Sequence, residues 1–201
     1  MGLLSRSTTF VRYEVEGNLP ENFWDFAAQR ISEFSFRDID DTFDEYSIGW
    51  VSIENMFDSS FAYGAYAVGD YIVLSLRIDE RKVSKTLLQK FSLKEEERIK
   101  KEKQVPRLSR SHRVRIREDI RLQLVKKSLP VPTVYDLCWN LADSTLLFFS
   151  TNTKAQSVLE DFFKECFGLT IFLQVPYLAA AHLLDESGQD KLASLQPEIL
   201  V

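Results

Sequence analysis

The stretch SKTLLQKFSLKEEERIKKEK, residues 84–103, decides how this chain is organised. It contains neither glycine nor proline and is rich in strong helix formers, so it predicts one long helix. The following Gln104-Val105-Pro106 ends that helix, because proline cannot continue the hydrogen-bonding pattern. Ser109 or Ser111 is suited to cap a second helix, which is expected to run to Ser128. The middle of the chain is therefore predicted to be a helical hairpin.

The chain before the hairpin reads as strands with one helix. Apolar spacing and turn residues predict, in order, a strand at 8–15, a helix after Asn18 with Pro20 in its first turn, an acidic surface loop at 38–45, and strands at 48–51, 63–68 and 71–78. Gly69-Asp70 between the last two strands is a tight-hairpin signal.

The chain after the hairpin repeats this mixture. LPVP at 129–132 stops the second helix. The next expected elements are a strand at 134–140, a turn at 142–144, a strand at 145–150, a helix at 153–167 ended by Gly168, a buried strand at 169–175, and a helical tail from Pro176.

Together these elements predict an α+β fold, with antiparallel sheet-and-helix halves and a long protruding basic α-hairpin. The predicted parts are an N-terminal α+β part at 1–78, the hairpin or tip at 79–132, and a C-terminal α+β part at 133–201. Whether the two halves share one sheet stays open at this point.

Charge is unevenly distributed along the chain. The formal net charge is −5 and the pI is about 5.2, which taken alone argues against a nucleic-acid partner. The window 77–127, however, holds 18 Lys and Arg against 8 Asp and Glu, a net charge of +10, so the remainder carries −15. Any nucleic acid is therefore expected to meet the hairpin and to avoid the rest of the protein.

Each hairpin helix carries one row of cations within an arc of about 80°. The row on the first hairpin helix consists of Lys90, Lys94, Arg98 and Lys101, and the row on the second consists of Arg110, Arg113, Arg117 and Arg121. Such rows can follow a phosphate backbone, and arginine adds bidentate geometry for phosphate oxygens. No pattern for reading base sequence accompanies them. The competing interpretation is that the charges merely solvate long helices, as an ordinary Glu97–Lys101 pair would.

Nothing in the sequence predicts catalysis, a metal or a cofactor. The acidic loop at 38–45 could in principle hold Mg²⁺ for a nuclease, but clustered acids in one loop are more typical of a solvated loop. His112 lies between arginines and is interpreted as a polar helix residue. Ser, Cys and His show no spacing typical of covalent catalysis.

Two cysteines, Cys138 and Cys166, are too few for a disulfide framework and too poorly spaced for a zinc site. They are predicted to be buried free thiols in a reducing cytoplasm. The sequence shows no signal segment and no apolar run long enough to span a membrane, so a cytoplasmic protein without a membrane partner is expected.

The aromatic residues are predicted to form the core. Base stacking is the alternative for the phenylalanines, but their spacing fits core positions of strands and a helix better. The predicted core aromatics are Trp24, Trp50, Trp139, Phe148, Phe149, Phe162, Phe163 and Phe167.

The pattern as a whole resembles the bacterial recombination-associated protein RdgC family, over the N-terminal half to two-thirds of that family. The segments that carry the resemblance are Gly49-Trp50-Val51, YIVLSLR at 71–77, KEEERIKK at 94–101, Leu129-Pro130, and then the order of 135–139, 146–150, Lys154-Ala155 and 169–176. The order of these segments is more persuasive than any one of them, because each is short.

This resemblance implies a non-catalytic, sequence-independent DNA-binding protein of the nucleoid. It implies a homodimer that closes into a ring around duplex DNA and restrains a RecA-type recombinase, with the hairpin in a tip that meets the partner subunit. The chain departs from the family by lacking a further C-terminal third and by carrying Val131-Pro132-Thr133 where members can place an aromatic residue, so ring-closing elements are expected to be missing. The alternatives are a protein-interaction or self-association module that uses the basic hairpin, and a metal-dependent exonuclease.

Overall fold

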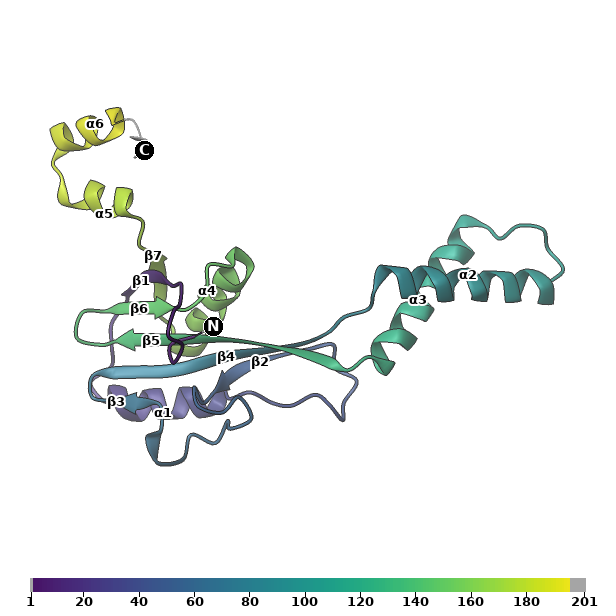
Figure 1. Ribbon diagram of the computed structural model, residues 1–201, viewed down its shortest axis with the longest axis horizontal. Helices are drawn as coiled ribbons and strands as arrows, with labels where there is room; N and C mark the ends of the chain where they lie inside the picture. Colours follow the sequence, from purple (N-terminus) through teal and green to yellow (C-terminus); the bar gives the residue numbers. More distant parts are fainter. Residues whose placement is uncertain (1, 196–201) are drawn as a thin grey trace.

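A single antiparallel sheet forms the centre of the protein, and Figure 1 shows a pair of helices projecting far from it. The computed structural model describes residues 2–195. The strands are β1 (Val11–Glu16), β2 (Tyr46–Val51), β3 (Ala67–Val68), β4 (Tyr71–Arg81), β5 (Pro130–Asn140), β6 (Thr145–Phe148) and β7 (Thr170–Leu173). The helices are α1 (Phe23–Glu33), the short 3₁₀ helix η1 (Ala62–Gly64), α2 (Lys85–Glu102), α3 (Arg110–Lys127), α4 (Thr153–Phe167), α5 (Pro176–Leu183) and α6 (Glu186–Ser194).

The sheet joins the parts before and after the hairpin. Its strand order is β2-β4-β5-β6-β1-β7, β3 also pairs with β4, and each of these pairs is antiparallel. This confirms the α+β fold class and answers the question that the sequence left open, because strands from both halves lie in one sheet. The predicted C-terminal part extends to Val201, and its end at 196–201 lies outside the described residues.

The longest strands, β4 and β5, position the hairpin. They pair over their whole lengths, from Tyr71 opposite Asn140 to Arg81 opposite Pro130. Within β5, only residues 137–140 pair with β6. The part of the β4–β5 ladder near Arg81 and Pro130 therefore extends past the end of β6. Because α2 and α3 connect these extended ends, the hairpin stands away from the sheet (Figure 1).

The core lies where α1 and α4 pack against one face of the sheet. Trp139 contacts Phe163 and Phe167 at ring-centroid distances of 5.1 and 5.4 Å, and Trp50 contacts Phe162 at 4.9 Å. All of the predicted core aromatics are buried except one. The prediction is wrong for Trp24, which is 42% exposed because α1 turns its neighbour Phe23 into the core instead.

Three predicted boundaries are wrong for identifiable reasons. The first helix begins at Phe23 and is preceded by Asn22, so Pro20 lies before it; the helix begins only where its apolar stripe reaches the core. The predicted strand 63–68 is η1 followed by the two-residue β3, because Phe61 and Gly64 adopt positive φ angles that break an extended chain.

The third wrong boundary concerns the last strand, which covers only Thr170–Leu173 and is not fully buried. Leu169 and Ile171 are buried, whereas Phe172 and Leu173 are exposed. β7 is an edge strand whose one face alone is covered, so an apolar sequence here does not mean burial on both faces. The first proline of the predicted stop at 129–132 opens β5, at the end where β4 is its only strand partner and a missing N–H costs little.

One glycine is required by close backbone approach. Segment 34–36 runs beside β2, where the Phe36 N–H donates to the Trp50 carbonyl and the Trp50 N–H to the Phe34 carbonyl, each at 2.9 Å. A Cβ on Gly49 would lie 2.3 Å from the Phe36 Cα, so no side chain fits there. The missing side chain at Gly49 therefore lets segment 34–36 pair with β2 and cover this edge of the sheet.

Candidate nucleic-acid interface

The hairpin helices form as the sequence predicts, with one ambiguity resolved. Ser109, not Ser111, caps α3: its Oγ accepts a hydrogen bond from the His112 N–H at 3.3 Å. The His112 ring also lies within 3.1 Å of the same Oγ, so this side chain is part of the cap.

The hairpin contains very little core. Ser92 is the buried residue of α2, and Ile116 and Val125 are the buried residues of α3. All eight predicted cations are exposed. We call the row on α2 the α2 stripe (Lys90, Lys94, Arg98 and Lys101) and the row on α3 the α3 stripe (Arg110, Arg113, Arg117 and Arg121). The hairpin is therefore mostly surface, and its charge arrangement dominates its chemistry.

The two stripes do not face each other. The α2 side chains that line a groove against α3 are Lys85, Gln89, Ser92, Leu93 and Glu96. At 100° per residue, the positions 85, 89, 92 and 96 point about 160° away from the α2 stripe. The α2 stripe therefore lies on the far side of α2 from this groove.

The α2 stripe is partly neutralised by neighbouring acids. Arg98 donates to both carboxylate oxygens of Glu95, at 2.6 and 3.0 Å, and to Glu102 at 3.0 Å. Hydrogen bonding from Arg98 lowers the pKa of Glu95 below its usual value. Lys90 lies 5.8 Å from the centre of the Phe91 ring. These contacts favour the solvation interpretation for this face.

The last residue of the α3 stripe has different contacts from the other three. Arg121 forms an ion pair with Glu45 of the acidic loop at 2.8 Å. Arg110, Arg113 and Arg117 line the groove between the helices, and no ion pair involves them within the described part of the chain. These three arginines are thus available to an anionic ligand.

The groove is a sizeable basic hollow, which we call the α2–α3 groove. It has a volume of about 620 Å³ and is lined by Lys85, Gln89, Ser92, Leu93, Glu96, Arg110, Arg113, Val114 and Arg117. Two further hollows, of about 690 and 320 Å³, share residues with it and add further cations, namely Arg115 in the first and Lys100 and Arg107 in the second.

Lys85, Lys100, Arg107 and Arg115 were not predicted as site residues. Arg107 follows the proline break, and Lys85 and Lys100 lie outside the α2 stripe. The spacing of 85, 89, 92 and 96 on one helical face was visible in the sequence. Only the packing of the two helices shows that this face meets α3.

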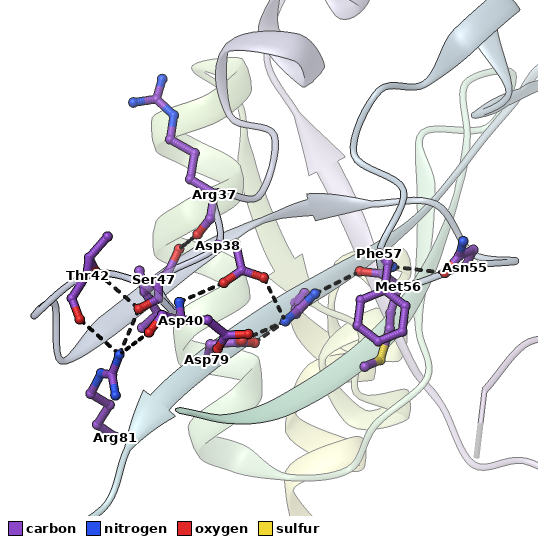
Figure 2. Close-up of polar contacts among 12 residues, drawn as sticks. Arg37, Asp38, Asp40, Thr42, Ser47, Asn55, Met56, Phe57, Asp79 and Arg81 are labelled. Carbon is purple, nitrogen blue, oxygen red and sulfur yellow. Dashed lines mark hydrogen bonds and ion pairs between the residues drawn. The ribbon is translucent and has the colours of Figure 1, made fainter. Parts of the chain in front are cut away.

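The root of the hairpin is a buried polar network on the sheet face opposite the aromatic core (Figure 2). Arg77 and Asp79 of β4 form a two-pronged ion pair, with Nε and Nη2 donating to the two carboxylate oxygens at 2.8 and 2.7 Å. Arg77 also donates to the Met56 carbonyl at 3.1 Å and lies over the Phe36 ring. Donating these hydrogen bonds to Asp79 raises the pKa of Arg77, so the guanidinium stays charged.

Arg81, the last residue of β4, ties the acidic loop to the hairpin. Its buried guanidinium donates to the loop carbonyls of Ile39 at 2.7 Å, Thr42 at 3.0 Å and Asp44 at 3.0 Å. Figure 2 shows the contact with Thr42. It also donates to the carbonyl of Ser128, the residue that ends α3. The loop thus holds Arg81 with backbone oxygens, not with its carboxylates.

The acidic side chains near this root form no metal-binding cluster among the described residues. Among residues 2–195, no group of three or more His, Cys, Asp and Glu side chains is placed to hold a metal ion. The acidic loop packs as structure around Arg81, with Ile39 buried. Within the same residues, no helix is both long enough and apolar enough to cross a membrane.

No protein-family model matches the chain, and no curated protein sequence matches it significantly.

Proposed function

We propose that this protein is a non-catalytic, sequence-independent DNA-binding protein that meets DNA through the α2–α3 hairpin. The observation that carries the proposal is a set of three exposed arginines, Arg110, Arg113 and Arg117, on a hairpin that projects from an acidic protein. Among the described residues, these three form no ion pair. Arginines in a row neutralise consecutive phosphates and release their counterions. The −15 charge of the remaining chain repels DNA elsewhere.

The same proposal includes the role implied by the resemblance to the RdgC family. In that role the chain acts as a homodimer on the nucleoid and modulates a RecA-type recombinase. The extended β4–β5 ladder supports it, because the ladder holds the basic hairpin at a distance from the acidic sheet, where a partner subunit or a DNA molecule can reach it.

Charge reversal tests the DNA-binding proposal. Arg113→Glu/Arg117→Glu is expected to weaken binding of a fluorescent 30-base-pair duplex at least tenfold, measured by anisotropy at low salt. Lys154→Glu/Lys164→Glu on α4 is the matched control, because it makes the same charge change at exposed positions of the body. Absence of duplex and single-strand binding by the unaltered protein, or equal losses in both variants, would overturn the proposal.

A second candidate, self-association through the hairpin, is supported by the Glu45–Arg121 ion pair. This contact shows that an α3 arginine already binds an acidic surface of this protein. A second copy could offer its acidic surface to the groove arginines in the same way. Light scattering with size-exclusion chromatography of Arg113→Glu/Arg117→Glu distinguishes the two. Self-association through these arginines predicts that a dimer becomes a monomer, whereas the DNA-binding proposal predicts weaker duplex binding with an unchanged oligomeric state.

A further inference from the structure

We propose that the α2–α3 groove binds a single, unpaired nucleic-acid strand, and that the α2 stripe takes no part in this contact. The inference rests on the proposed DNA-binding function and specifies its ligand and its site. It assigns the backbone of the strand to the α3 arginines and its bases or sugars to the groove floor.

The spacing of the groove arginines suits a strand backbone. Arg110, Arg113 and Arg117 follow one another along α3 with rises of about 4.5 and 6 Å. Consecutive phosphates of one strand are about 3.4 Å apart along a duplex axis and further apart when the strand is extended. A long guanidinium side chain covers the remaining difference, so each arginine can reach its own phosphate.

Two aliphatic side chains in the groove distinguish a single strand from a duplex. Leu93 of α2 and Val114 of α3 are 53% and 50% exposed, although both line a groove rich in cations. The bases of a duplex are paired and stacked, so a duplex lying on the rim offers these side chains only phosphates and sugars. Unpaired bases can turn toward them and cover their apolar surface.

A hydroxyl group in the groove lacks a partner. Ser92 lines the groove and is only 7% exposed, and among the described residues its Oγ has no hydrogen-bond partner. Buried polar groups are normally satisfied, so such a hydroxyl is a candidate ligand contact.

Among the described residues, Glu96 is the one acid that lines the groove, where Lys85 shares its face of α2 and three arginines come from α3. It forms no ion pair among the described residues, so it repels a bound phosphate without being needed for a salt bridge. Glu96→Gln is therefore expected to raise affinity for a single strand about two- to fivefold, as expected for one partly exposed charge interaction.

The test compares fluorescein-labelled (dT)20 with a 20-base-pair duplex, titrated by anisotropy with the full chain. The unaltered protein is expected to bind (dT)20 more tightly than the duplex. Arg113→Ala/Arg117→Ala is expected to lose at least tenfold in (dT)20 affinity. Lys94→Ala/Lys101→Ala removes the same charge from the far side of α2 and is expected to lose less than threefold. Leu93→Asp is expected to abolish the preference for (dT)20, and circular dichroism verifies that each variant keeps its helices.

The outcomes separate the inference from the function on which it rests. If the duplex binds as tightly as (dT)20, or if both double variants lose equally, the groove inference is wrong while DNA binding stands. If neither DNA binds, the proposed function fails as well. If polyglutamate binds in the groove and DNA does not, an acidic protein is the ligand and both proposals are overturned. If Glu96→Gln fails to raise (dT)20 affinity, the placement of the strand beside Glu96 is wrong.

Discussion

At the scale of single residues, Cys166 shows how burial controls chemistry in the core. Its thiol is fully buried, accepts a hydrogen bond from the Trp50 Nε1–H at 3.2 Å, and has its pKa raised by burial to about 12. Cys138 is only half-buried, so the prediction of two buried thiols is confirmed for Cys166 alone.

This raised pKa predicts a loss of stability at high pH. The unfolded thiol loses its proton above about pH 8.5, whereas the folded thiol keeps it until about pH 12. The stabilisation is therefore complete below pH 8.5 and falls as pH rises, by up to about 1.4 kcal/mol per pH unit from this group.

The measurement is the free energy of unfolding in urea at pH 8 and pH 10. Cys166→Ala is expected to lose less stability than the unaltered protein over this interval. Cys138→Ala, whose half-buried thiol has its pKa raised less, is expected to retain most of the pH dependence. Identical pH slopes in all three proteins would contradict the assignment.

At the scale of elements, Arg81 makes the position of the hairpin depend on the acidic loop. One guanidinium holds carbonyls from both the loop and the end of α3, and the Glu45–Arg121 ion pair and the contact of Lys126 with the Phe43 ring lie beside it. Lysine keeps the charge but cannot fork to several carbonyls.

Arg81→Lys is therefore expected to lower the free energy of unfolding by about 2–4 kcal/mol, since several hydrogen bonds to a charged group are lost and buried carbonyls stay unsatisfied. Urea unfolding measures this change. Arg115→Lys, an exposed α3 position, is the control and is expected to change stability by less than about 0.5 kcal/mol. Faster hydrogen exchange in 38–45 and at the end of α3 is also expected. Equal stability of the two variants would contradict this role.

The hairpin also shows what could be predicted from sequence and what could not. Helix formers, the Ser109 cap and the proline break predicted α2 and α3 to within a residue or two, because these signals are local. The rotation of α2 about its own axis relative to α3 could not be predicted from the sequence, because it depends on how two weakly apolar helices pack. The stripe pattern alone therefore pointed to both helices, whereas the stripe residues that line the groove are Arg110, Arg113 and Arg117 of α3.

At the scale of the whole molecule, the fold separates the basic hairpin from the acidic remainder of the chain. The β4–β5 ladder carries the basic hairpin away from the acidic sheet, so the overall pI of about 5.2 hides a surface suited to phosphate (Figure 1). The same ladder was underestimated from the sequence, since the prolines near its end look like a stop signal. Its extension depends on pairing with β4, which is a long-range contact.

This separation predicts how strongly DNA binding depends on salt. If the strand is held by Arg110, Arg113, Arg117 and Lys85, about four phosphates are neutralised. The logarithm of the binding constant for (dT)20 should then fall against the logarithm of salt concentration with a slope of about −3. Anisotropy titrations from 20 to 200 mM NaCl measure it, and Arg113→Ala should reduce the slope by about 0.7. The Lys94→Ala/Lys101→Ala control should leave the slope unchanged. A slope steeper than about −6 would require cations beyond this groove, from the α2 stripe or from a second copy, and would show that one hairpin groove is not the whole interface.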